Sequence, residues 1–341
     1  MKKYILTITE TEKEHAGSKA KNDCSFFLHS LGYLSIYLDK DMGRLEKYLF
    51  ANETLNRKLS VLDAGDLLLI QYPTYIGKMY MKILLNKLKK RNVRTVLLIH
   101  DVETLREHFY DEKLIKEEID SLNKFNIIIS HNDKMTEWLR RYGITSEIIE
   151  LEIFDYQTSN RIDRSITQEN QIVFAGNLNK SLFLTRMSTR KTRLNLYGPN
   201  PQKKVLNDRI RYIGSFSPDE LPVYLTGKYG LVWDGDTLSS CKGKYGNYLR
   251  FNNPHKASLY ISSEMPVIIW KEAAIADFIV NNHLGLAIDS LADVDRVMES
   301  VSDDEYKEFM VAVKSMSEKL RSGYFVKKAM KKAENILMEG Q

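Results

Sequence analysis

The fold is decided by the stretch Tyr245-Gly-Asn-Tyr-Leu-Arg-Phe-Asn-Asn-Pro-His-Lys-Ala-Ser-Leu-Tyr-Ile-Ser-Ser-Glu-Met-Pro-Val-Ile-Ile-Trp270. Its pattern predicts a polar, aromatic loop, then a helix, then a buried strand. We expect the side chain of Asn253 to cap the helix. Pro254 then fits the first helical position, where its missing N–H costs nothing.

Lys256 lies in the first turn of this expected helix, together with His255. The helix dipole disfavours a cation at that end. Unpaired backbone N–H groups and a lysine at a helix start make a seat for an anion such as phosphate. The alternative is a surface lysine that falls there without a role, and this stretch alone leaves both interpretations open.

Size and composition limit the classes of protein to which the chain can belong. The chain has 341 residues, of which 43% are hydrophobic and 28% charged, which is enough for two buried cores. No apolar run reaches the roughly 20 residues that a membrane span needs, and the short apolar run at the N-terminus does not form a signal peptide. Cys24 and Cys241 have no metal-binding spacing and predict free thiols in a reducing cytoplasm.

The first half of the chain alternates apolar runs with helical segments. Strands are expected at 3–9, 33–37, 66–71, 94–100, 126–130 and 146–151, and helices at 19–31, 42–62, 80–90, 110–123 and 134–142. Within 66–71, residues 67–70 are continuously apolar rather than alternating, as in strands of parallel sheets. We therefore predict right-handed βαβ crossovers and an open parallel sheet.

A polar segment without periodicity, 155–170, predicts a linker. A second α/β series follows, with strands expected at 171–176, 192–197, 210–213, 229–233, 266–270 and 285–289, and helices at 302–320 and 324–338. Two open α/β sheets in tandem leave a cleft between the carboxyl ends of their strands, and ligands bind there.

Several polar residues of the first half fall at such strand ends. Gly17, Ser18 and Lys19 belong to the loop expected after the first strand. His100 and Asp101 follow a buried strand, where an imidazole or a carboxylate could take a proton from a hydroxyl, and Glu103 is a nearby candidate. The alternative for His100 is a buried histidine that caps the sheet edge.

The second half offers three candidates. The loop Gly176-Asn-Leu-Asn-Lys180 allows close backbone approach and carries a cation, although it matches no nucleotide motif and an ordinary turn is an alternative. Tyr197-Gly198 suits stacking or backbone contact with a base. Asp234-Gly-Asp236 could hold a divalent metal, or form a turn or a metal-free polar contact.

These residues converge on a known family. The motifs Phe174-Ala-Gly-Asn-Leu-Asn-Lys180, Leu196-Tyr-Gly198, Asn253-Pro-His-Lys-Ala-Ser-Leu-Tyr260 and His15-Ala-Gly-Ser-Lys-Ala20 resemble the streptococcal glucosyltransferase 3 group, which is similar to galactofuranosyltransferase-like enzymes. The likeness covers nearly the whole chain. One departure is Glu264-Met265, where many enzymes of the GT-B architecture have a small residue and a glycine, so the usual glycine at a helix C-terminus is missing.

The resemblance implies a GT-B fold, in which two Rossmann-like, open parallel-sheet domains face each other across a cleft. The domains would be 1–155, with the C-terminal helix 324–341 packing back on it, and 156–323, which would bind the nucleotide sugar. The implied reaction moves glucose from UDP-glucose to O-linked N-acetylglucosamine on a serine-rich repeat adhesin. The implied enzyme is a cytoplasmic homo-tetramer with no cofactor and no metal.

Site residues follow from the same resemblance. Those that would meet UDP are Asn177, Lys180, Tyr197, Gly198, Asp234, Asn252 and Lys256. Those facing the cleft from the acceptor side would be Gly17, Ser18 and Lys19, and the candidate bases are Asp101 and His100.

Other functions stay open on the sequence. One is a metal-dependent D-x-D transferase with a different donor specificity, and another is a non-catalytic, nucleotide-sugar-binding partner subunit. Nucleic-acid binding is disfavoured, because a net charge of +5 without a basic stripe or a recognisable module is weak support.

Overall fold

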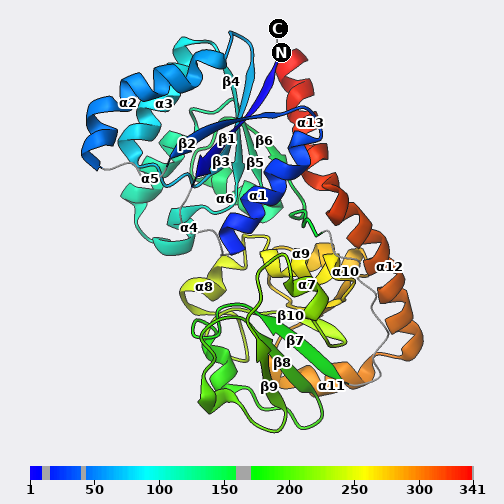
Figure 1. The fold of residues 1–341 in the computed structure, drawn as a ribbon. Coiled ribbons are helices and arrows are strands. Elements are labelled where there is room, and N and C mark those ends of the chain that lie inside the picture. The colour runs from blue at the N-terminus through cyan, green and yellow to red at the C-terminus, as the bar shows by residue number, and fades with distance from the viewer. Residues whose placement is uncertain (10–15, 40–43, 159–169, 340–341) are drawn as a thin grey trace. The chain divides into compact units, whose positions relative to one another are not determined.

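The computed structural model describes residues 1–9, 16–39, 44–158 and 170–339 (Figure 1). The chain divides into two compact units, Met1–Leu151 with Val326–Gln341, and Glu152–Phe325. The sequence placed a division between residues 155 and 156 and gave the first unit the helix from residue 324. Most of the expected linker lies outside the described residues.

The first unit is built on a six-stranded, all-parallel sheet with strand order β2-β1-β3-β4-β5-β6. Its strands are β1 (Lys3–Thr9), β2 (Leu34–Asp39), β3 (Leu67–Tyr72), β4 (Arg94–Ile99), β5 (Ile127–Ser130) and β6 (Glu147–Glu150). The central strands are buried on both faces, which explains their continuous apolar runs. The predicted open parallel sheet is confirmed.

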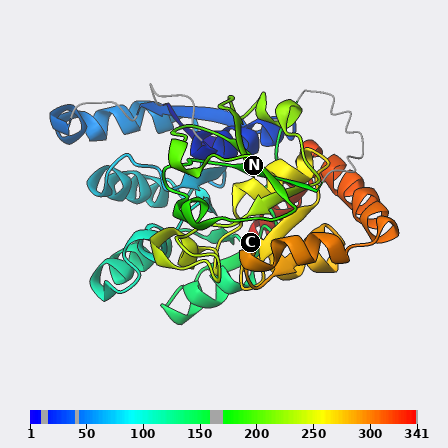
Figure 2. The ribbon, with the colours of Figure 1, turned by 90° about the horizontal axis from the view of Figure 1, so that it is seen from below.

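Helices cover both faces of this sheet. They are α1 (Ala16–His29), α2 (Arg44–Lys58), α3 (Lys78–Lys90), α4 (Glu103–Glu107), α5 (Glu112–Leu122), α6 (Asp133–Arg141) and α13 (Tyr324–Glu339). Right-handed crossovers put α1 on one face and the other connecting helices on the opposite face, where α2, α3 and α5 form a row (Figure 2). Glu334 of α13 bonds to Lys3 and Tyr33 and so ties the C-terminal helix to this sheet.

Two helices of the first unit differ from the prediction. Ala16, Gly17 and Ser18 were read as a loop, but they form the first turn of α1. The short helix α4 was not predicted. Its first two N–H groups, at Glu103 and Thr104, donate to the carboxylate of Glu118, so a contact distant in sequence stabilises its start.

The second unit repeats the architecture with the strand order β12-β11-β10-β7-β8-β9, again all parallel. Its strands are β7 (Gln171–Ala175), β8 (Arg193–Tyr197), β9 (Ile210–Gly214), β10 (Tyr229–Val232), β11 (Val267–Trp270) and β12 (Gly285–Ile288). Its helices are α7 (Leu221–Tyr224), α8 (Gly243–Tyr248), α9 (His255–Ser262), α10 (Ala276–Asn281), α11 (Val294–Ser300) and α12 (Asp303–Ser322).

The helix predicted at the centre of the sequence is α9, but its start differs from the expectation. Pro254 is the N-cap residue in an extended conformation, and within the described residues no side chain caps the first turn. The amide of Asn253 instead donates to the carbonyl of Glu152, 3.0 Å away. The prediction that Asn253 caps the helix was therefore wrong.

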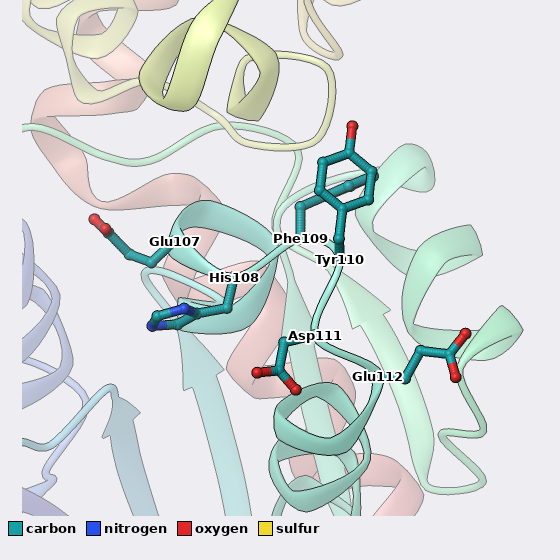
Figure 3. Close-up of a pocket in the computed structure, with 6 residues that line it drawn as sticks. All are labelled: Glu107, His108, Phe109, Tyr110, Asp111 and Glu112. Carbon is teal, nitrogen blue, oxygen red and sulfur yellow. The ribbon is translucent and has the colours of Figure 1, made fainter.

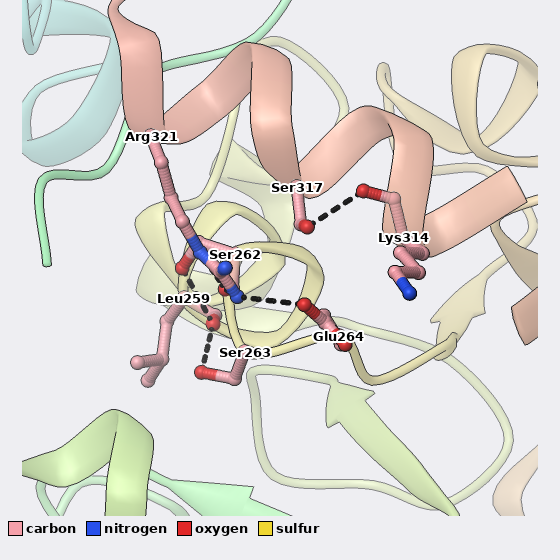
Figure 4. A network of polar contacts seen from close by, with 7 residues as sticks. All are labelled: Leu259, Ser262, Ser263, Glu264, Lys314, Ser317 and Arg321. Carbon is pink, nitrogen blue, oxygen red and sulfur yellow. Dashed lines mark hydrogen bonds and ion pairs between the residues drawn. The ribbon is translucent and has the colours of Figure 1, made fainter. Parts of the chain in front are cut away.

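The other end of α9 explains how a glutamate replaces the usual glycine. Glu264 adopts a left-handed conformation with φ of 55°. Arg321 of α12 donates to the carbonyl of Ser262 and lies 3.3 Å from the carboxylate of Glu264 (Figure 4). A guanidinium that pairs with a helix C-terminus is favourable, so α12 holds α9 in place from its far end.

Candidate active site

The candidate donor site lies where β7 and β8 end in the second unit. Gly198 follows β8 with φ of +126°, and a Cβ there would lie 2.0 Å from the carbonyl oxygen of Gly176. Only glycine allows this approach. The N–H of Gly176 also donates to the carbonyl of Tyr197 at 3.0 Å, so the ends of the two strands form a bare backbone surface.

Hydrogen bonds join the two loops that follow Gly176 and Gly198. The N–H of Leu178 donates to the carbonyl of Pro199, and the Asn200 amide donates to the Oδ1 of Asn177 at 3.3 Å. The same Oδ1 accepts the N–H of Asn179. Asn177 therefore organises the loop, and its backbone lies at the predicted strand edge. Lys180 is exposed at the end of this turn.

Lys256 is placed over this surface by α9. A Cβ added to Gly176 would lie 3.2 Å from the Cε of Lys256, and the ammonium lies 5.0 Å from the centre of the Phe174 ring. One helical turn later Tyr260 is fully buried, and its hydroxyl accepts the N–H of Ala175 at 2.8 Å. Because residues i and i+4 share a helix face, this anchor also aims Lys256 at the strand ends.

The anchor depends on a glycine in the sheet. A Cβ at Gly230 in β10 would lie 2.1 Å from the Cγ of Tyr260, so the tyrosine ring occupies the space that any other residue would fill. Neither Gly230 nor Tyr260 was recognised as important from the sequence. The signal was present only as a glycine inside a buried strand, which marks close approach of another group.

Asp234 forms an ion pair with Lys256, with 2.6 Å between Oδ1 and Nζ. The lysine and aspartate side chains are 20% and 27% exposed, so the pair is reachable from solvent. In the structure, the charged partner of Asp234 is therefore an ammonium group. Among the described residues, no group of three or more His, Cys, Asp or Glu side chains is arranged to hold a metal ion.

Asn252 contributes an unsatisfied acceptor near the start of α9. Its Oδ1 is buried, and no hydrogen-bond partner for it lies in the described part of the chain. A buried polar atom without a partner costs about 1–3 kcal/mol, so a ligand that donates a hydrogen bond here would recover free energy. The first residue of α9 is His255, and the centre of its imidazole ring lies 5.1 Å from the centre of the Tyr156 ring.

Tyr197 does not offer its ring to a ligand. The side chain is fully buried, its hydroxyl donates to the carbonyl of Tyr224 at 2.9 Å, and it accepts the N–H of Thr226. Of the two contacts that the sequence suggested, stacking is ruled out by this orientation, whereas backbone contact at Tyr197-Gly198 stays a prediction.

The first unit places His100 and Asp101 directly after β4. Asp101 is ion-paired with Arg106 of α4 at 2.7 Å. The Nε2 of His100 lies 2.8 Å from the Oε1 of Gln71. The Gln71 amide nitrogen donates to the carbonyl of Lys21, so its oxygen must face His100 and Nε2 carries the proton.

This geometry constrains both candidate bases. Proton uptake by His100 would occur at Nδ1, which is buried. Asp101 would have to give up part of its interaction with Arg106, a residue that the sequence reading did not single out. The next histidine along the sheet edge, His131, is fully buried, and burial lowers its pKa to about 3.

The acceptor-side residues Gly17, Ser18 and Lys19 lie in the first turns of α1. Lys19 is buried, and its ammonium lies 2.6 Å from the carboxylate of Asp23. The pair is four residues apart on one helix face, so the sequence contained this signal. Lys19 therefore serves an internal ion pair, and Ser18 is half-buried.

No helix of the described residues is both long and apolar enough to cross a bilayer. Cys24 and Cys241 are both buried, and neither forms a disulfide. Burial raises the pKa of the Cys241 thiol, which keeps it protonated at neutral pH.

Comparison with solved structures shows the fold. The chain is similar to Staphylococcus aureus TarM, with a TM-score of 0.58 and 15% identity over 84% of this chain and 57% of that one. It is also similar to a trehalose-6-phosphate synthase, with a TM-score of 0.62 and 11% identity over 98% of this chain and 99% of that one. These neighbours are glycosyltransferases of the GT-B fold, so the predicted fold class is confirmed.

Comparison with known sequences shows the family. β-1,6-Galactofuranosyltransferase WbbI of Escherichia coli (strain K12) is 32% identical over 94% of this chain and 95% of that protein. Glucosyltransferase 3 of Streptococcus gordonii is 27% identical over 97% of both chains. Residues 2–153 and 172–333 match the N-terminal and C-terminal domains described as glucosyltransferase 3-like. The chain belongs to the glucosyltransferase 3-like family of glycosyltransferases.

Proposed function

We propose that this glycosyltransferase moves a hexosyl group from a UDP-hexose to a carbohydrate acceptor without a metal ion. The observation that carries the proposal is the position of Lys256. Its Cε lies beside Gly176, whose backbone meets that of Gly198, and the residue stands in the first turn of a helix whose N-cap residue, Pro254, makes no side-chain capping hydrogen bond. Backbone donors, a helix N-terminus and one lysine are what a diphosphate needs.

The reaction breaks the bond between the anomeric carbon and the β-phosphate oxygen. Negative charge then collects on the departing diphosphate, and a positioned cation stabilises that charge more than it stabilises the intact donor. In this proposal Lys256 leaves Asp234 and pairs with the diphosphate. The loop that contains Asn177 and Lys180 lies beside the phosphates. The Oδ1 of Asn252 accepts a hydrogen bond from the UDP-hexose.

On the acceptor side, Asp101 and His100 remain the proposed groups that take the proton of the attacking hydroxyl. Asp101 would have to release Arg106, and His100 would have to expose its buried Nδ1, before either group takes the proton, so both stay in the proposal. Gly17 and Ser18, in the first turn of α1, stay proposed acceptor-side residues, whereas Lys19 is buried in its ion pair with Asp23.

We propose glucose as the transferred sugar and N-acetylglucosamine, O-linked to a serine-rich repeat adhesin, as the acceptor. Two relatives that align with 97% of this chain are named glucosyltransferase 3, and both come from streptococci. Galactofuranose is the second candidate, because the relative at 32% identity is named a galactofuranosyltransferase. A homo-tetramer, which sedimentation analysis would test, completes the proposal.

A donor panel tests this function. The protein would be mixed with UDP-glucose, UDP-galactofuranose or UDP-N-acetylglucosamine and a serine peptide that carries N-acetylglucosamine, with and without EDTA. We expect a mass increase of one hexose from UDP-glucose that survives EDTA. Transfer only from UDP-galactofuranose would select the second candidate. Transfer that EDTA abolishes and manganese restores would return Asp234 and Asp236 to a metal-binding role.

Variants separate catalysis from binding alone. We expect Lys256→Ala to lower turnover, and near-normal transfer by this variant would remove the leaving-group role. UDP binding by the wild type without transfer from any donor would instead indicate a non-catalytic partner subunit.

A further inference from the structure

A pocket in the first unit takes no part in the donor site. It encloses about 620 Å³ and is lined by the loop after β3 and by parts of α3, α4 and α5. That volume falls within the roughly 300–1,000 Å³ of small-molecule sites. We call it the α3–α5 pocket, and the lining residues used below are Pro73, Tyr75, Met81, Glu103, Leu114 and Glu118.

The back of the α3–α5 pocket is rigid. Glu118 is buried, and its carboxylate accepts the hydroxyl of Tyr72 at 2.5 Å and the N–H groups of Glu103 and Thr104 at 3.0 and 2.9 Å. It also accepts the hydroxyl of Thr104. Four donors therefore saturate this carboxylate, which joins the end of β3 and the start of α4 to the middle of α5. Glu118 shapes the pocket and is not available to a ligand.

Glu103 is the carboxylate that lines the pocket beside Tyr75. It is half-buried, and its side chain hydrogen-bonds with that of Tyr75. Burial, followed by the nearby charge of Glu118, raises the pKa of Glu103. A hydrogen bond from a neutral hydroxyl group stabilises the negative charge of such a half-buried carboxylate and brings no further charge into the pocket.

Tyr75 offers a ring beside this carboxylate. Its backbone is left-handed with φ of 55°, and 46% of the side chain is exposed. Such strained backbone positions cluster at functional sites. Pro73, Met81 and Leu114 add apolar walls. An aromatic face, apolar walls and a hydrogen-bonding carboxylate together suit a ring compound that carries both hydroxyl groups and C–H faces, which is a sugar.

The loop between α4 and α5 borders the same region. Figure 3 shows Glu107 and His108 pointing to one side of this loop, and both also line the α3–α5 pocket. Phe109 and Tyr110 rise from the other side, and Tyr110 is 88% exposed. The pocket lining carries charges of both signs, from Lys78, Lys82 and Lys124 and from Glu103, Glu107, Glu117 and Glu118, so it presents no excess of cations to a diphosphate.

We propose that the α3–α5 pocket binds the acceptor sugar, with Glu103 accepting a hydrogen bond from one of its hydroxyl groups and Tyr75 lying against its ring. This inference rests on the proposed function, since it names where that reaction holds its acceptor. The pocket lies beside the carboxyl ends of β3 and β4, the edge at which open α/β sheets bind ligands.

The test compares Glu103→Gln and Tyr75→Ala with Asp120→Asn, a matched control at an exposed position of α5 that does not line the pocket. Each variant is assayed with the preferred UDP-hexose and the N-acetylglucosamine-bearing serine peptide. Loss of a charged hydrogen bond predicts an acceptor KM that rises about tenfold or more in Glu103→Gln. UDP affinity, measured by calorimetry, should stay within about twofold of the wild type.

Acceptor KM values equal to that of the control in both pocket variants would overturn the proposal. A second measurement does not depend on turnover. Methyl N-acetylglucosaminide at millimolar concentration should protect Glu103, but not Asp120, from carbodiimide labelling, as read by peptide mass spectrometry. Equal labelling of Glu103 with and without the sugar would also overturn it. If the wild type transfers no sugar, the proposed function fails, and protection of Glu103 still decides the pocket.

Discussion

The position of Lys256 depends on a steric fit between a glycine and a tyrosine, and Gly230→Ala tests it. The new Cβ would lie 2.1 Å, 2.4 Å and 2.6 Å from three carbons of the Tyr260 ring. Carbon atoms pack at about 3.5–4.0 Å, so the ring must move by about 1 Å or more. The hydrogen bond from the N–H of Ala175 to the Tyr260 hydroxyl, 2.8 Å long, would then be lost.

Two costs set the magnitude. Overpacking of a close-packed core costs about 1–3 kcal/mol, and an unpaired buried N–H adds about 1–3 kcal/mol. Their sum of roughly 2–6 kcal/mol corresponds to a fall in the unfolding temperature of about 4–24 °C for a unit of this size. Because Tyr260 carries Lys256 on the same helix face, UDP affinity should fall as well.

Thermal unfolding and UDP calorimetry on four proteins provide the assay. They are the wild type, Gly230→Ala, Tyr260→Ala and the double variant. Removal of the ring opens the space that the new methyl needs, so the double variant should be no less stable than Tyr260→Ala alone. Additive losses in the double variant, or a Gly230→Ala protein with wild-type stability and UDP affinity, would refute the reasoning.

Three further predictions concern other parts of the chain. Gly198→Ala places a methyl 2.0 Å from the carbonyl of Gly176, so calorimetry should show UDP affinity lowered by about tenfold or more, and wild-type affinity would contradict this. Glu264→Gly should be about 1 kcal/mol more stable in denaturant unfolding than Glu264→Ala, because both lose the contact with Arg321 but only glycine relieves the left-handed backbone. His131 stays neutral in the folded protein because burial lowers its pKa to about 3, so the unfolded state binds its proton first as pH falls below about 6.5. The unfolding free energy should therefore drop by about 2 kcal/mol more between pH 7 and pH 5 in the wild type than in His131→Gln, and equal drops would contradict this.

The fold was predictable because its signal is local and repeated. Short continuous apolar runs such as 67–70, which follow turn residues, favour strands that are buried on both faces, and their alternation with helices leaves few topologies. The helix starts were less predictable. Asparagine is a common helix-capping residue, but the side-chain amide of Asn253 donates a hydrogen bond to the carbonyl of Glu152, about a hundred residues away in sequence.

The candidate site divides in the same way. The positions of Gly198 at a strand end and of Lys256 in the first turn of a helix were predictable, because strand ends and helix starts have local sequence signals. The orientation of Tyr197 was not, because strand periodicity says which residues share a face but not which face the sheet buries. The dependence of Lys256 on Gly230 arises from packing between distant segments, which no local pattern encodes.

The central claim is that Lys256 and the glycine-lined strand ends hold a diphosphate without a metal. Calorimetric titration of UDP and of UMP in EDTA tests it most directly, with Lys256→Met beside the wild type and Lys271→Met as a control from an exposed ion pair of the same unit. We expect UDP to bind the wild type and the control about tenfold or more tighter than UMP, and the difference to vanish in Lys256→Met. Equal affinity of the wild type for UDP and UMP, or a preference for UDP that appears only when a divalent metal is added, would contradict the claim.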